Sequence, residues 1–160
     1  MALSIYLTIS ILILHFTYHL RKPLSFLENG IIFMVVAIIT RQCLTLLALE
    51  WGLYRMTEDS WLFICLLLCR DLLTPLMTII FINFYVRAVA WGSKMTAFFI
   101  ALGVLLALHK LAVDFDLITY IKWNFFYTTL LNAGFLLSGI AVFKIISIFK
   151  PMENVDNESL

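Results

Sequence analysis

Five long apolar runs, separated by short clusters of charged and polar residues, constrain this chain more than any other feature of its sequence. A helix rises about 1.5 Å per residue, so about 20 apolar residues cross the hydrocarbon core of a bilayer. Of the 160 residues, 63% are hydrophobic and only 13% are charged, which is too few to cover a soluble domain. The sequence therefore predicts an all-α membrane protein, a bundle of five transmembrane helices. The expected spans are residues 3–20, 30–49, 61–86, 96–113 and 117–143.

Basic residues near the span ends predict the orientation. Five spans place the two termini on opposite sides, and Lys and Arg gather on the cytoplasmic side. With the N-terminus outside, the inside would hold Arg21, Lys22, Arg87, Lys94, Lys144 and Lys150, against Arg55, Lys110 and Lys122 outside. We therefore expect a multi-pass protein of the cytoplasmic membrane, with its N-terminus outside and its C-terminus cytoplasmic. Residues 1–150 would form one transmembrane domain, and residues 151–160 a short disordered acidic tail.

The most informative residues are polar ones inside the expected spans: Arg41, Arg70, Asp71, His109, Lys110 and Asn124. Counting helical turns places Arg41 and Asp71 about 15–17 Å from the interfaces at which their spans begin, near mid-membrane. The spans that carry them are joined by a short connection and are expected to be neighbours. The sequence therefore predicts an Arg41–Asp71 ion pair, with Arg70 as a surplus cation nearby.

Two interpretations of this polar layer remain open. In the first, the polar side chains hold helices together by ion pairs and hydrogen bonds, and the lysines extend to the interface. In the second, they line a net-positive cavity that opens outward and binds an anionic head group or solute, or passes a proton through His109. Pro75 leaves the carbonyl four residues earlier, at Asp71, without its helical partner, which is also the signature of an ordinary kink.

Other constellations are less specific. His15 and His19 share one helix face, as metal ligands often do, but no third ligand is evident and no metal site is predicted. The three cysteines all lie in spans and give no disulfide framework. Small residues four apart permit close helix contact; they are Gly134 with Ser138, and Ala97 with Ala101.

No catalytic signature is present. The chain lacks HExxH, GxSxG and a phosphate-binding loop, and no acid or Ser/Lys pair has the spacing of an intramembrane protease. We therefore expect neither an enzyme nor a cofactor. The net charge of +1 argues against nucleic acid as a partner.

One stretch carries a resemblance. Asn83-Phe84-Tyr85 follows Pro75, and after a basic loop come Asp116-Leu117-Ile118-Thr119-Tyr120-Ile121-Lys122-Trp123 and the aromatic run Phe125-Phe126-Tyr127. This pattern resembles a family of small, uncharacterised five-helix membrane proteins of Bacillus-type spore-forming bacteria, over about the last hundred residues. The resemblance implies the fold and the location but no reaction. It would make Pro75 a kink, Asn83 a cap, and Tyr120 and Trp123 interface anchors, whereas His109-Lys110 stands where relatives carry an acid.

Two functions from different classes follow as expectations. The first is a nonenzymatic envelope, assembly or interaction factor that works through helix–helix contacts, with the lipid bilayer and other membrane proteins or a second copy as partners. The second is a transporter-like protein that binds a small solute, an ion or a lipid through the buried polar layer.

Overall fold

Within the part of the chain that the structure describes, five helices are long and apolar enough to cross a bilayer. The computed structural model describes residues 1–20 and 23–157, with side chains up to residue 149. The spans are α1 (Ala2–His19), α2 (Phe26–Leu49), a continuous segment made of α3 (Ser60–Leu67), the π-helix η1 (Leu68–Leu73) and α4 (Thr74–Arg87), then α5 (Trp91–Asp114) and α6 (Phe125–Asn157). The predicted five-helix bundle is confirmed.

The α3–η1–α4 segment forms the centre of the bundle. It packs against all four other long helices, whereas α1 packs mainly against this central segment. Of its most apolar stretch, 67% of the residues are buried, against 22–28% in the other four spans. The outer helices therefore present most of their surface to lipid, and the central segment carries the interior.

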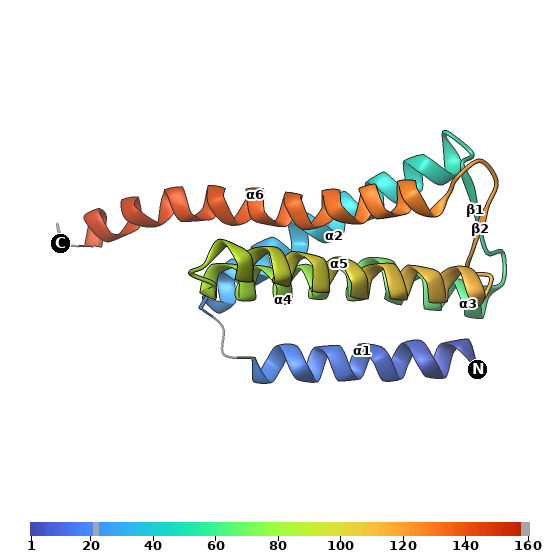
Figure 1. The fold of residues 1–160 in the computed structure, drawn as a ribbon, viewed down its shortest axis with the longest axis horizontal. Helices are drawn as coiled ribbons and strands as arrows, with labels where there is room; N and C mark the ends of the chain where they lie inside the picture. Colours follow the sequence, from blue (N-terminus) through green and yellow to red (C-terminus); the bar gives the residue numbers. More distant parts are fainter. Residues whose placement is uncertain (21–22, 158–160) are drawn as a thin grey trace.

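The two ends of the bundle differ. At one end, which we call the sheet end, the short strands β1 (Tyr54–Met56) and β2 (Ile118–Tyr120) pair antiparallel, with Arg55 opposite Thr119. They join the α2–α3 connection to the α5–α6 connection, and the N-terminus lies at the same end (Figure 1). The end of α1, the start of α2 and the α4–α5 connection lie at the opposite end, the loop end, toward which α6 also extends. The expected separation of the two chain ends is therefore present, while the side that faces the cytoplasm stays a prediction.

Several boundaries differ from those expected. The fifth span begins at Phe125 rather than at residue 117, because residues 117–124 form β2 and its flanks. Asp116 has φ of 56°, and this left-handed turn lets Leu117 and Ile118 fold under the sheet, where both are buried. Residues 151–157 of the expected tail continue α6, and residues 158–160 lie outside the described residues.

Local sequence signals explain the helix starts. Ser25 and Glu28 form a capping box at the start of α2, each side chain bonding to the other residue's backbone N–H. The Asp59 carboxylate accepts bonds from the N–H groups of Trp61 and Leu62 at the start of α3. Both caps lie where the chain enters a span, so they fix the limits of the apolar segments.

Candidate functional site

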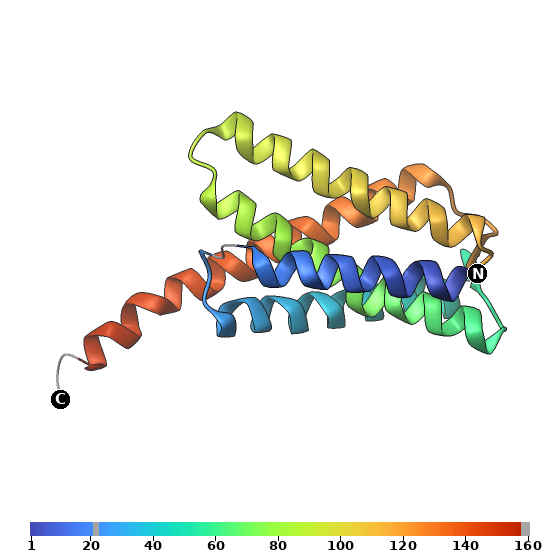
Figure 2. The same cartoon turned by 90° about the horizontal axis from the view of Figure 1, so that it is seen from below.

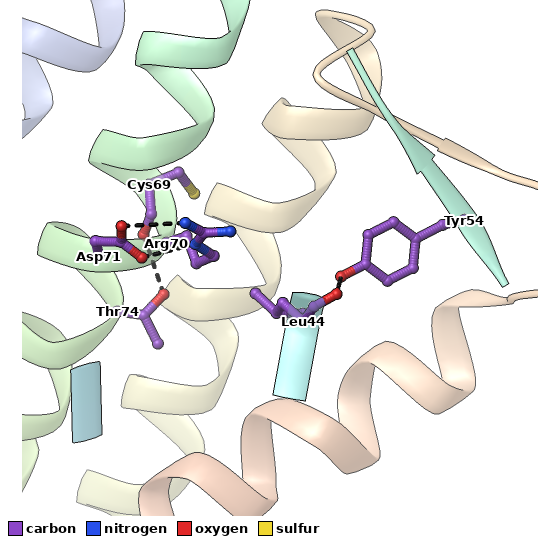
Figure 3. A network of polar contacts seen from close by, with 6 residues as sticks. All are labelled: Leu44, Tyr54, Cys69, Arg70, Asp71 and Thr74. Carbon is purple, nitrogen blue, oxygen red and sulfur yellow. Dashed lines mark hydrogen bonds and ion pairs between the residues drawn. The ribbon is translucent and has the colours of Figure 1, made fainter. Parts of the chain in front are cut away.

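An ion pair between neighbouring residues occupies the middle of the central segment. Arg70 Nε lies 2.6 Å from Asp71 Oδ1, and Arg70 Nη2 lies 3.1 Å from Asp71 Oδ2 (Figure 3). The Arg70 side chain is 6% exposed and that of Asp71 is 30% exposed. The planar guanidinium thus meets the carboxylate with two parallel hydrogen bonds, which is the strongest geometry for such a pair.

The pair lies in a π-helical turn that the local sequence favours. Pro75 has no N–H to offer the preceding turn, so the regular bonding pattern is interrupted just before it. Thr74 donates both its backbone N–H and its hydroxyl to the carbonyl of Cys69, five residues earlier, the hydroxyl at 3.1 Å. This i to i−5 bonding widens the turn that carries Arg70 and Asp71. Pro75 therefore lies just after a π-helical turn, near the start of α4.

The expected Arg41–Asp71 ion pair is wrong, because Arg41 faces outward. The buried residues of α2 follow a stripe that includes Val36, Thr40 and Leu44, and Arg41 is one residue, about 100°, away from Thr40. Arg41 is exposed and has no ion-pair or hydrogen-bond partner among the described residues. Arg41 and Asp71 lie at corresponding levels of their helices, since each is twelve residues from the Asn29–Asn83 contact. They do not pair because the Arg41 side chain is exposed on the outer side of α2.

The remaining residues of the expected layer do not join the pair. His109 is partly buried, and its ring stacks on that of Tyr120 with centroids 6.3 Å apart. Lys110 is exposed and pairs with Asp114 one turn along α5. Asn124 precedes α6 and caps it, its side-chain oxygen accepting from the Tyr127 N–H at 3.0 Å. The single polar layer expected from the sequence is therefore divided between the bundle centre and the sheet end.

Two polar contacts between elements, one buried and one partly buried, were missed by sequence reasoning. Asn83, expected to be a cap, donates to the side-chain oxygen of Asn29 at 2.8 Å and so links α4 to α2 near the loop end. Near the sheet end, the Thr128 hydroxyl bonds with the Tyr120 hydroxyl at 3.0 Å and accepts from the Trp123 indole at 2.9 Å. Tyr120 and Trp123 thus attach the sheet to α6. The sequence signal that could have indicated the first contact is an Asn in each of two neighbouring helices, Asn29 in α2 and Asn83 in α4.

The sheet is also attached to α2. The buried Tyr54 side chain donates its hydroxyl to the carbonyl of Leu44, which lies in the last part of α2 (Figure 3). Burial raises the pKa of the Tyr54 phenol above its ordinary value of about 10, because the charged form would lose its hydration. Tyr54 is therefore a neutral donor that closes the sheet end over the bundle.

Among the described residues, two of the cavities lie between helices. An apolar groove of about 910 Å³ is bordered by α1, α4 and α5, with His15 and His19 at its loop end. A smaller cavity of about 390 Å³ lies between α2 and α6, beside Gly134. Neither is lined by any residue of the expected polar layer.

The two small-residue pairs that could permit close helix contact contribute to cavity walls instead. Ala97 and Ala101 line the groove, and Gly134 lines the smaller cavity. The close approach is instead at Gly139, where an added Cβ would lie 2.5 Å from Thr78 Cγ2 on α4. His15 and His19 have ring centroids 4.4 Å apart, and the described residues contain no group of three metal-ligating side chains.

The fold and these contacts define a class, that of multi-pass integral membrane proteins with lipid-facing outer helices. No protein-family model, curated protein or solved structure matches the chain. The resemblance to the five-helix proteins of spore-forming bacteria therefore stays a prediction and carries no argument about function.

Proposed function

We propose that this chain is a nonenzymatic protein of the cytoplasmic membrane that acts as an assembly or interaction factor, by holding a transmembrane helix of another protein against α2. The observation that supports this is the outward position of Arg41. An arginine at the centre of a lone transmembrane helix costs about 2.5–3.5 kcal/mol on insertion scales, and such residues normally face a protein interior. An arginine that faces outward at this depth calls for a partner outside the chain.

The surroundings of Arg41 fit a helix-binding surface. Arg41 lies eight residues before the end of α2, about 12 Å along the helix axis. Gln42 beside it is also exposed, and Met34 and Ile38 continue the same outward face at helical spacing, 65% and 57% exposed. We call residues Met34, Ile38, Arg41 and Gln42 the Arg41 face. Its polar pair in an apolar stripe is complementary to a helix that carries an Asp or Glu at the same depth.

Extension of the side chain toward the sheet-end interface is the competing explanation for Arg41. A long basic side chain can reach polar surroundings while its stem stays in the hydrocarbon. Lysine does this as well as arginine, but it cannot form the two-pronged bond to a carboxylate. The two explanations therefore make different predictions: only the proposed interaction requires another helix beside the Arg41 face.

The test is in-cell photocrosslinking from Ile38, with Leu137 on α6 as the matched control because both side chains are 57% exposed. We expect one discrete product from Ile38, none from Leu137, and loss of the product in Arg41→Leu at unchanged accumulation. Equal, diffuse products from both positions, or an unchanged Ile38 product in Arg41→Leu, would contradict the proposal. A product of twice the chain mass would identify a second copy as the partner.

The transporter-like alternative would need a cavity bordered by the polar residues it invokes. The two cavities described above are bordered by none of Arg41, Arg70, Asp71 and His109. No specific observation therefore favours binding of a solute or an ion at this layer.

A further inference from the structure

The groove between α1, α4 and α5 exists because two helices diverge. Near the sheet end, the Tyr6 hydroxyl of α1 donates to the carbonyl of Leu108 on α5 at 3.4 Å. From there α5 runs away from α1 toward the loop end (Figure 2). The α5 wall carries the small residues Ala97 and Ala101, and Phe81 of α4 is part of the floor. The cavity has a volume of about 910 Å³, within the size range of ligand pockets, roughly 300–1,000 Å³.

The polar groups of the groove all lie at one end. His15 and His19 lie in the last two turns of α1, and Ser93 and Thr96 lie in the first two turns of α5. Every other side chain that lines the groove is apolar. A ligand that matches this surface has one polar end, near the membrane interface, and an apolar remainder that runs along α4.

Charge at the loop end indicates the sign of that polar end. Arg87 ends α4, and Lys94 lies in the first turn of α5 with its ammonium 5.1 Å from the centre of the Tyr85 ring. Among the described residues of α1, α4 and α5, no acidic side chain lies at this end, and Glu28 at the start of α2 is engaged in the capping box with Ser25. The first turn of α5 also lacks a side-chain cap, so its N–H groups add to the positive potential.

We propose that this groove binds an anionic phospholipid, with its phosphate among His15, His19, Ser93 and Thr96 and one acyl chain along Phe81. A second helix fits the groove less well, because a helix about 10 Å across would fill 910 Å³ in about two turns. An acyl chain is thin enough to follow the groove over its full length. The proposal is independent of the Arg41 face, which lies on α2.

The test is native mass spectrometry of the full chain in detergent with two lipids that share palmitoyl and oleoyl chains. These are phosphatidylglycerol, which is anionic, and phosphatidylcholine, which has no net charge. We expect one retained phosphatidylglycerol, bound at least about fivefold more tightly than phosphatidylcholine, because each nearby cation contributes about that factor. The double variant Arg87→Gln/Lys94→Gln should reduce this preference, because both lipids carry the phosphate but only phosphatidylglycerol has a net negative charge.

A matched pair of α5 variants locates the lipid. Ala97→Leu fills the groove and should abolish retention of phosphatidylglycerol, whereas Ala107→Leu, on the exposed side of the same helix and outside the groove, should keep it. Equal retention of the two lipids by the unmodified chain would overturn the proposal. So would full retention by Ala97→Leu, or a dimer that Ala97→Leu disrupts while no lipid is held. If Ala97→Leu fails to fold, the comparison of the two lipids on the unmodified chain decides the question.

Discussion

Removing Asp71 should destabilise the bundle more than removing Arg70, although the two side chains form one ion pair. Asp71→Leu leaves a guanidinium that is 6% exposed without a counter-charge, and arginine cannot lose its proton in a protein. Stranding a buried charge in this way costs about 3–5 kcal/mol. Arg70→Met leaves a carboxyl group that is 30% exposed and can become neutral by taking up a proton, so we expect a smaller loss, about 1–3 kcal/mol.

The double variant Arg70→Met/Asp71→Leu completes the thermodynamic cycle. Replacing both members of a buried pair by apolar residues is often nearly neutral, so the double variant should be more stable than Asp71→Leu alone. Cys65 and Cys69 are buried and Cys43 is partly buried, so a thiol-reactive dye reports unfolding during a thermal ramp in detergent. The reasoning is refuted if Arg70→Met costs as much as Asp71→Leu, or if the double variant is the least stable of the three.

Three further predictions use the same thermal assay. Gly139→Ala should cost about 1–3 kcal/mol, because its Cβ would lie 2.5 Å from Thr78 Cγ2, whereas Gly134→Ala meets nothing within 4 Å and should be neutral or stabilising; equal effects would contradict the close approach. Asn83→Leu should cost about 1–3 kcal/mol, because it leaves the side-chain oxygen of Asn29 without its donor. Asn132→Leu should cost less, because the Asn132 amide bonds only to Thr128 in its own helix; a reversed order would count against the α2–α4 link. Burial raises the pKa of the Tyr54 phenol, so the folded state holds that proton more tightly than the unfolded state, and stability should fall as the pH rises past about 10. Tyr54→Phe should lose part of this pH dependence, and an unchanged loss of stability at alkaline pH would argue against a buried phenol.

The spans could be predicted because their limits are electrostatic. Charged clusters cannot remain in the hydrocarbon, so the ends of the runs follow from composition alone. The sheet could not be predicted in the same way, since Ile118, Tyr120 and Ile121 are as apolar as the span that follows them. The left-handed turn at Asp116 separates them from α5, and the Asn124 cap separates them from α6. Both are single polar residues beside an apolar run: Asp116 lies just before the fifth span expected from the sequence, and Asn124 lies inside it.

The direction of each side chain was harder to predict than its depth, for a reason specific to bilayers. In a soluble helix the apolar stripe marks the buried face, but in lipid the outer face is apolar too. The interior of this bundle is marked instead by polar residues at helical spacing, such as Asn29 and Thr40 on α2 and Thr128 and Asn132 on α6. Read by that rule, Arg41 lies off the stripe that Thr40 defines. A charged residue on the stripe, such as Arg70, finds its counter-charge inside the chain. One that lies off the stripe has to find it elsewhere, which is why the proposed interaction is assigned to α2 rather than to the buried ion pair.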